Sequence, residues 1–236
     1  MRGRGRNSLE TNSEMRGRFI TFEGGEGTGK STQAAALAQR LRAMGIGVVL
    51  TREPGGSPGA EIIRHVILSG AAKPLGPDAE AILFAAARDD HVNTTIEPAL
   101  ARGHWVVSDR FADSTKVYQG ALGRVDPLLI GGLHRVTIGT LRPDLTFILD
   151  LPAEIGLQRA AARRGELGAD RFEGESLEFH EKLRDAYLHL AASEPNRCVL
   201  IDARDALDAV TGRIWETVAR RLDPATAPVT LEDVAS

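Results

Sequence analysis

Short runs of apolar residues alternate along the chain with longer segments in which apolar residues recur every three or four positions. The short runs predict strands at residues 19–22, 48–51, 105–108, 145–150 and 199–202. The longer segments predict helices at 58–68, 78–101, 153–164, 176–192 and 207–222, and a further helix that starts near Lys30 and stops at Gly45. Such alternation is typical of a parallel sheet with right-handed crossovers and helices on both faces. The pattern therefore predicts a three-layer α/β fold with a five-stranded parallel sheet.

Composition and charge narrow the class of protein. Of the 236 residues 42% are hydrophobic and 26% are charged, the balance of an ordinary globular domain. The formal net charge of -3 gives no global basic field, so we expect no nucleic-acid partner. No apolar run approaches the roughly 20 residues that span a bilayer, so we expect no membrane segment. Cys198 is the only cysteine, which excludes an intramolecular disulfide and fits the reducing cytoplasm.

Two terminal segments differ from the rest of the chain. Residues 1–17 are rich in arginine, glycine and polar residues and predict a disordered basic extension. Residues 224–236 predict a loose tail. The folded domain is therefore expected at 18–223.

The segment "GGEGTGKS" matches the phosphate-loop pattern G-x-x-x-x-G-K-[ST] and lies between a predicted strand and a predicted helix. Its glycines allow backbone N–H groups to surround phosphate oxygens, and the helix N-terminus adds partial positive charge. Lys30 is expected on the β- and γ-phosphates and Ser31 on Mg²⁺. The match predicts a P-loop NTPase-type fold that binds a nucleoside triphosphate, with the binding residues expected at Gly24, Gly25, Glu26, Gly27, Thr28, Gly29, Lys30, Ser31 and Thr32.

A second group of charged residues is predicted at the same edge of the sheet, where the strands end. Arg52 and Arg110 each follow a strand and could together hold a second phosphate through their planar guanidinium groups. Asp109 is placed to orient hydrated Mg²⁺, although a local ion pair with Arg110 would explain it equally well. Phe84 and Arg88 lie four residues apart on one helix face, where they could stack and hydrogen-bond a flat base. Phe84 could also be an ordinary core residue.

The blocks "FITFEGGEGTGKST", "TREPGG", "DRFADSTKVYQG" and "PDLTFILDLPAEIGLQR", in this order and spacing, resemble the bacterial type of thymidylate kinase. The resemblance runs from about Phe19 to Leu222. It implies transfer of the γ-phosphoryl group of ATP to dTMP, giving dTDP and ADP for dTTP synthesis. It also implies a Mg²⁺ cofactor and a homodimer.

The resemblance further implies roles for individual residues in the dTMP site. Glu26 would accept a hydrogen bond from the 3′-hydroxyl, Phe84 would stack on thymine, and Arg88 would bond a thymine carbonyl. Thr115 would lie near thymine N3, and Tyr118 would pack beside the deoxyribose. The full expected set is Glu26, Arg52, Phe84, Arg88, Arg110, Ser114, Thr115 and Tyr118, in which Arg52 and Arg110 hold the phosphate.

Some members of this family carry an arginine in the phosphate loop, whereas others place catalytic arginines in a mobile lid. Here Gly27 and Thr28 carry no charge, so a lid at about 159–173 is expected to supply it. The candidates are Arg159, Arg163, Arg164 and Arg171, of which Arg163 or Arg164 is preferred, and Gly165 and Gly168 would be the flexible points. A solvated helix end is the alternative. With Lys30 and Arg110, these arginines complete the expected catalytic set.

Other interpretations remain open from the sequence. The protein could be a kinase for another nucleoside monophosphate, or a P-loop nucleotide-binding switch without catalysis. Lys116, Val117 and the acidic "DDHV" after Arg88 depart from what the resemblance leads us to expect. Lys116 adds a charge near the expected substrate phosphate with no evident purpose. No general base stands out, and none is required, because a phosphate monoester with a second pKa of about 6 is already a nucleophile.

Overall fold

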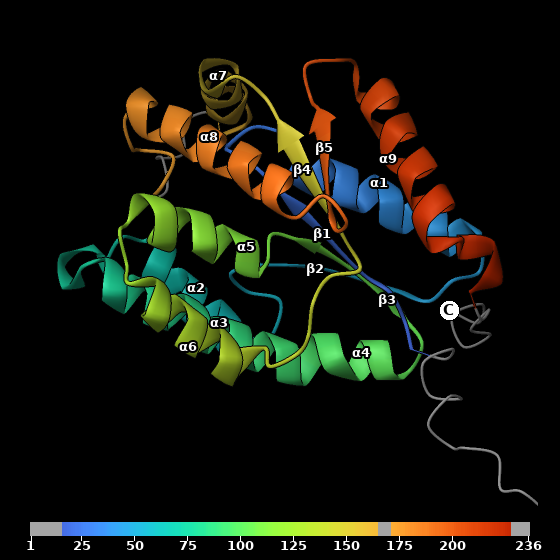
Figure 1. Ribbon diagram of the computed structural model, residues 1–236, viewed down its shortest axis with the longest axis horizontal. Coiled ribbons are helices and arrows are strands. Elements are labelled where there is room, and N and C mark those ends of the chain that lie inside the picture. Colours follow the sequence, from blue (N-terminus) through green and yellow to red (C-terminus); the bar gives the residue numbers. More distant parts are fainter. Residues whose placement is uncertain (1–15, 165–170, 228–236) are drawn as a thin grey trace, which may run out of the picture.

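A computed structural model describes residues 16–164 and 171–227 (Figure 1). Its centre is a parallel sheet of five strands in the order β2-β3-β1-β4-β5. The strands are β1 (Phe19–Glu23), β2 (Val48–Arg52), β3 (Trp105–Asp109), β4 (Leu145–Asp150) and β5 (Cys198–Asp202). Each agrees with its predicted strand to within one residue at either end. The predicted parallel α/β sheet is therefore confirmed.

Helices cover both faces of this sheet. Those of one turn or more are α1 (Lys30–Ala43), α2 (Pro58–Leu68), α3 (Pro77–His91), α4 (Glu97–Ala101), α5 (Ala112–Thr115), α6 (Pro127–Thr137), α7 (Ala153–Arg164), α8 (Leu177–Ser193) and α9 (Leu207–Leu222). Short 3₁₀ turns are η1 (Lys73–Leu75) and η4 (Pro224–Thr226), and π-helical segments are η2 (Val92–Ile96) and η3 (Lys116–Leu122). Helices α1 and α9 pack on one face, and α4, α8 and the α5–η3 segment pack on the other (Figure 1).

The strand order brings three strand ends together. β1 lies between β3 and β4, and its carboxyl end leads directly into the glycine-rich loop. In the register of the sheet, Asp109 at the end of β3 pairs with both Phe22 of β1 and Arg52 of β2. The loop, Asp109 and Arg52 therefore meet at one edge of the sheet, as expected for a ligand site in a parallel sheet.

The helix predicted at 78–101 is broken, which corrects the prediction. The structure has α3, then the π-helical segment η2, then α4. Pro98 stands at the start of α4, lacks an N–H group, and would clash with the carbonyl four residues before it in a regular helix. The wider turn of η2 accommodates this proline.

Helix α6 and the α5–η3 segment were not predicted. Gly131 and Gly132 interrupt the apolar period of α6, although its N-terminus carries ordinary start signals. The Asp126 side chain accepts a hydrogen bond from Leu128 N at 2.8 Å, and Pro127 occupies the first turn. These signals outweigh the weak helix propensity of the two glycines.

Parts of the predicted terminal segments and lid lie outside the described residues, namely 1–15, 165–170 with Gly165 and Gly168, and 228–236. At the amino end, Gly17 N donates to Leu100 O at 2.9 Å. At the carboxyl end, Pro224 is buried at the start of η4. Within the described ranges, no helix is both long enough and apolar enough to cross a membrane.

Candidate active site

The phosphate loop requires glycine for two reasons: a positive φ angle and close packing against a neighbouring backbone. Gly24, Gly27 and Gly29 have φ angles of 136°, 66° and 95°, which disfavour other residues. A Cβ atom at Gly27 would lie 1.9 Å from Gly156 O of α7, so the loop packs against its neighbour. A Cβ atom at Gly29 would meet nothing within 4 Å, so this glycine faces open space. The loop thus packs against α7 at Gly27 and is open at Gly29, where a phosphate chain would approach.

The Lys30 side chain folds back so that its ammonium group contacts this loop. Its Nζ donates to Gly25 O at 2.6 Å and to Gly24 O at 3.2 Å. Burial lowers the pKa of Lys30 to about 8, with a further contribution from Arg110 that nearby carboxylates oppose. A phosphate chain in the loop would offer the ammonium group a stronger acceptor than these carbonyls.

Ser31 and Asp109 lie together beside the loop, where the Ser31 hydroxyl donates to the Asp109 carboxylate. Hydroxyl and carboxylate oxygens are the ligands that Mg²⁺ prefers. Arg110 pairs with Glu26 rather than with Asp109, so the Asp109–Arg110 ion pair considered from the sequence does not form. Within the described ranges no cluster of three or more His, Cys, Asp or Glu could hold a metal. A metal here would therefore take most of its ligands from phosphate and water.

Arg110 is held rigidly under the phosphate loop. Its backbone adopts a φ of 71°, which is rare for a residue with a side chain. Its Nη2 donates to Glu26 Oε1 at 2.5 Å, and its Nη1 donates to Gly24 O at 3.1 Å. The guanidinium also lies 5.2 Å from the centre of the Tyr118 ring. Burial opposes the charge, but Tyr118, Glu26 and other neighbours outweigh it and raise the pKa of Arg110.

Glu26 remains a carboxylate in this setting. Its Oε1 accepts from Tyr118 OH at 2.9 Å as well as from Arg110. Burial would raise the pKa of Glu26, but the charges of Arg110 and Lys30 overcome it and lower this pKa to about 2. Glu26 therefore presents a strong hydrogen-bond acceptor to the cleft that Arg52 and Arg110 also line.

The buried carboxyl group of Glu23 contacts the residues that surround Arg110. It accepts hydrogen bonds from Phe111 N at 2.8 Å, Ser114 Oγ at 2.7 Å and Tyr187 OH at 3.1 Å. Arg110 Nη1 lies 3.4 Å from both Ser114 Oγ and Tyr187 OH. Burial, helped by the charge of Asp113, raises the pKa of Glu23 to about 7.

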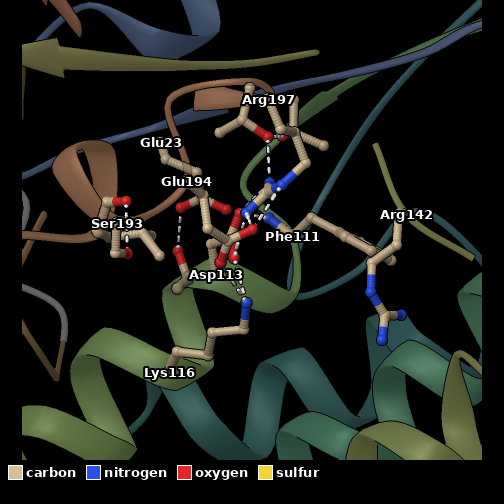
Figure 2. Close-up of polar contacts among 12 residues, drawn as sticks. Glu23, Phe111, Asp113, Lys116, Arg142, Ser193, Glu194 and Arg197 are labelled. Carbon is tan, nitrogen blue, oxygen red and sulfur yellow. Dashed lines mark hydrogen bonds and ion pairs between the residues drawn. The ribbon is translucent and has the colours of Figure 1, made fainter. Parts of the chain in front are cut away.

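Lys116 belongs to a separate ion network (Figure 2). Its Nζ pairs with Asp113 at 3.0 Å and with Glu194 at 3.3 Å, and Arg197 pairs with the same two carboxylates at 2.6 and 2.7 Å. Lys116 does not line the large cleft. Its charge, unexplained from the sequence, thus ties the α5–η3 segment to the end of α8.

The far end of the cleft is aromatic. Phe84 and Tyr118 pack near Phe172, with ring centres 6.1 and 5.2 Å from it. Arg88 is buried beside them, and its Nε donates to Glu53 Oε2 at 2.7 Å. Among the described residues its Nη1 has no hydrogen-bond partner. An unsatisfied buried donor is costly, so a ligand carbonyl would find a ready partner here.

These parts open onto one cleft of about 330 Å³. The predicted residues that line it are Glu26, Gly27, Gly29, Lys30, Ser31, Thr32, Arg52, Phe84, Arg88, Asp109, Arg110, Ser114, Tyr118 and Arg163. Gly24, Gly25 and Thr28 instead border a small cavity behind the loop. Thr115 is buried, is not among the lining residues, and has an Oγ1 with no partner within the described residues. The phosphate loop, the two arginines and the aromatic end thus share one space.

Comparisons with known proteins agree with this geometry. The family model described as Thymidylate kinase matches residues 22–214. The thymidylate kinase of Bradyrhizobium diazoefficiens is 66% identical over 92% of this chain and 95% of its own. That of Nitrobacter winogradskyi is 65% identical over 88% of this chain and 90% of its own. The crystal structure of thymidylate kinase from Ehrlichia chaffeensis aligns with a TM-score of 0.68 and 32% identity, over 86% of this chain and 98% of that one.

The chain belongs to the thymidylate kinase family. The resemblance described from sequence blocks is thereby confirmed, and so is the P-loop NTPase-type fold. The roles of individual residues within the family site remain predictions.

The arginines expected in the lid of this family member occupy different places. Arg163 lines the cleft and donates to Glu173 at 3.2 Å. Arg159 donates to Ala203 O at 3.1 Å and borders a second cavity of about 400 Å³. Arg171 pairs with Glu80 and Glu175 and does not line the cleft. The Arg164 side chain lies outside what the structure describes.

Several residues at this thymidylate kinase site were missed from the sequence. Glu53, Gln119 and Phe172 line the cleft, and Tyr187 supports Arg110 from α8. Glu53 and Gln119 stand inside the quoted blocks "TREPGG" and "DRFADSTKVYQG", which was the available signal. Tyr187 offered none, because it looks like an ordinary apolar position of α8.

Proposed function

We propose that the chain transfers the γ-phosphoryl group of ATP to dTMP, giving dTDP and ADP in dTTP synthesis. Membership of the thymidylate kinase family supports this activity. The observation that carries the proposal is the shared cleft, which joins a phosphate loop to Arg52 and Arg110. A nucleotide-binding switch would need the phosphate loop but not a second phosphate site opposite it.

In the proposed complex, dTMP lies along the cleft. Its phosphate sits between Arg52 and Arg110, where the guanidinium groups can bond its oxygens. Its sugar lies at Glu26, whose oxygens accept hydrogen bonds, and its base extends toward the aromatic end at Phe84 and Arg88. Ser114 contributes by holding Arg110 rather than by touching the base. Gln119 is a further candidate for base contact, since it also lines the cleft and carries an amide that can donate and accept hydrogen bonds.

ATP occupies the loop side of the site. Backbone N–H groups of the loop and the N-terminus of α1 hold the phosphates. The second cavity, bordered by Thr28, Thr32, Arg159 and Arg204, is large enough for a nucleoside and adjoins the loop. We place the adenosine part of ATP there.

Ser31 and Asp109 would hold Mg²⁺ together with the phosphate oxygens. Their hydroxyl and carboxylate oxygens lie together next to the phosphate loop and are suitable Mg²⁺ ligands. When bound, the ion neutralises charge on the transferring phosphoryl group. Lys30 and the lid arginines Arg163 and Arg164 neutralise the remaining negative charge on the transferring phosphoryl group. Arg110 and Arg52 orient the acceptor for in-line attack. No residue needs to remove a proton, because the acceptor phosphate is already mostly dianionic.

We also infer a homodimer and a cytoplasmic location. Exposed apolar side chains on neighbouring helices support the dimer: Ile62 of α2, Ile82 of α3, and Leu128 and Val136 of α6, the last two 82% exposed. Such residues favour burial against a second surface. The cytoplasm is where ATP and nucleoside monophosphates are available, and the buried thiol of Cys198 suits a reducing compartment.

The test is a coupled ADP-release assay with ATP–Mg²⁺ and a panel of dTMP, dUMP, dCMP, dAMP and dGMP. We expect dTMP to give the highest kcat/KM. Faster turnover of another monophosphate would replace dTMP as the substrate. A lack of turnover with every monophosphate, in protein that binds ATP, would support the switch instead.

A further inference from the structure

A buried cluster of ionisable side chains lies behind the aromatic end of the cleft. Arg88 and His91 come from α3, and Glu53 comes from the loop after β2. Their side chains are 1%, 0% and 3% exposed. Neither Glu53 nor His91 has a role in the phosphoryl transfer described above. Buried charged groups are costly unless they are fully paired, so the arrangement needs a reason.

The hydrogen bonds of the cluster form a chain. Glu53 Oε2 accepts from Arg88 Nε at 2.7 Å, and Glu53 Oε1 lies 3.0 Å from His91 Nδ1. His91 Nε2 lies 2.7 Å from Thr51 Oγ1. A carboxylate paired with arginine only accepts, so Nδ1 of His91 carries the proton and donates to Glu53. In the neutral ring, Nε2 then accepts from the Thr51 hydroxyl.

The ring of His91 is confined by the backbone of the "TREPGG" block. A Cβ atom at Gly56 would lie 2.5 Å from His91 Nε2 and 2.3 Å from Thr51 Oγ1, so only glycine fits there. The neighbouring Asp90 accepts from Ser57 Oγ at 2.6 Å and from Ala60 N at 3.0 Å. The acidic "DDHV" segment thus fastens the end of α3 to the start of α2. His91 consequently has little freedom to turn.

This confinement fixes the orientation of Glu53, which in turn holds Arg88. An arginine commonly meets a carboxylate as a fork, using two nitrogens and both oxygens. With Nε, the second nitrogen of the fork is Nη2, as in the pair of Arg184 with Asp150. Here Glu53 contacts Arg88 through Nε alone, and the other oxygen of Glu53 faces His91. Arg88 Nη2 lies 3.4 Å from Phe111 O instead, and Nη1 has no partner among the described residues. Arg88 lines the cleft beside Phe84.

We propose that His91 is a positioning residue for nucleobase recognition: by holding Oε1 of Glu53, it fixes the carboxylate that orients the Arg88 guanidinium, and so keeps Nη1 in place for a carbonyl of the base. This inference rests on the proposed function, because it assumes that the base lies beside Arg88. Without the His91 N–H, Glu53 is free to turn and to take Arg88 as a fork through Nε and Nη2, and the guanidinium rotates so that Nη1 no longer meets the base. His91 acts through Glu53 and Arg88 and does not touch the substrate.

The experiment compares two ligands, dTMP and 2-deoxyribose 5-phosphate, which lacks the base. Dissociation constants are measured by calorimetry for the wild-type chain and for His91→Leu. We expect His91→Leu to weaken dTMP by about tenfold or more, the size of one hydrogen bond to a charged donor. The affinity for 2-deoxyribose 5-phosphate should change by less than about twofold, because the phosphate and sugar contacts are intact. A distorted cleft would weaken both ligands alike, and that result would overturn the proposal.

Two polar variants keep the test decisive if His91→Leu does not fold. The amide of His91→Asn can take the place of Nδ1 and donate to Glu53, whereas that of His91→Gln corresponds to Nε2 and faces Thr51. The proposal requires His91→Asn to retain most of the preference for dTMP over the base-free ligand and His91→Gln to lose it. Equal behaviour of the two variants would contradict it. His189→Leu, on the exposed face of α8, is the control for removal of a histidine.

The proposed function fails in a different way. If the wild-type chain bound dTMP no more tightly than 2-deoxyribose 5-phosphate, base recognition itself would be absent, and both the site assignment and the role of His91 would be rejected. If the wild type prefers dTMP and the His91 variants keep that preference unchanged, the proposed function stands and only the role of His91 is rejected.

Discussion

Arg52 and Arg110 stand at the same edge of the sheet, at the ends of neighbouring strands, yet their surroundings differ. The Arg110 side chain is 15% exposed and bonds to Glu26, Gly24 and Ser114. The Arg52 side chain is 55% exposed and forms an ion pair with the half-exposed Glu61 at 3.0 Å. One guanidinium is therefore fixed before any ligand arrives, and the other must be ordered by the ligand. The difference separates a preorganised group from an adaptable one.

Preorganisation matters most where charge changes during the reaction. A fixed cation stabilises a developing charge without having to reorganise first. An exposed arginine loses side-chain entropy when it binds, and water screens its charge, so it contributes less. We therefore propose that Arg110 acts in catalysis as well as in binding, and that Arg52 captures the acceptor phosphate.

Arg110→Ala should have the largest effect. It removes the fixed cation and leaves Glu26 without its buried partner, so kcat/KM for dTMP should fall by about 10³-fold. Steady-state kinetics at saturating ATP measure this. Arg110→Lys keeps a charge but cannot bond Glu26 and Gly24 O together, and it should remain at least about tenfold impaired. Full activity of the lysine variant would show that only charge matters and not the fixed geometry.

Arg52→Ala should have a smaller and different effect. We expect KM for dTMP to rise about tenfold while kcat changes by less than about threefold, because one exposed contact to the acceptor is lost. The same kinetic assay measures it. Glu61→Gln is a matched control that keeps Arg52 but weakens its pair in the empty site. A fall in kcat as large as that of Arg110→Ala would erase the distinction between the two arginines.

Glu23, which contacts the residues around Arg110, should affect how the stability of the protein depends on pH. Burial raises the pKa of Glu23 from 4.5 to about 7, so the folded protein binds more protons than the unfolded chain between these values. The free energy of unfolding should therefore contain a contribution that falls as pH rises from about 4.5 to 7 and that stays lost above 7. Glu23→Gln does not titrate and should lack this contribution.

Urea unfolding of the wild type and Glu23→Gln at several pH values between 5 and 8 measures the effect. The wild-type free energy of unfolding should fall relative to that of the variant over this range. Asp113 and Arg110 face Glu23, but the pKa of Asp113 is lowered and that of Arg110 is raised, so neither group changes its charge between pH 5 and 8. Parallel curves would mean that Glu23 keeps an ordinary pKa.

The same two arginines show how far the sequence alone could lead. The strands were predictable because each is a short buried apolar run, and the positions of Arg52 and Arg110 follow directly from where those strands end. The loop glycines and Lys30 follow from the phosphate-loop pattern. What lies around the arginines was not predictable in this way.

The supporting contacts join residues far apart in the chain. Tyr187 reaches Glu23 across 164 positions, and Glu53 reaches Arg88 across 35. A periodic pattern reports which face of a helix is buried but not which distant group a buried hydroxyl or imidazole will meet. For this reason the partners of Tyr187 and His91 could not be predicted. The break of the long helix is different: Pro98 was a local signal for it and was missed.

The proposed function requires two phosphate sites that open onto each other in one cleft. The most direct test is the binding of a bisubstrate compound in which adenosine and thymidine are joined through a chain of phosphates long enough to span both sites. We expect this compound to compete with both ATP and dTMP and to bind more tightly than either, because one molecule fills both sites. Competition with only one of the two substrates, at an affinity no better than that substrate's own, would contradict it.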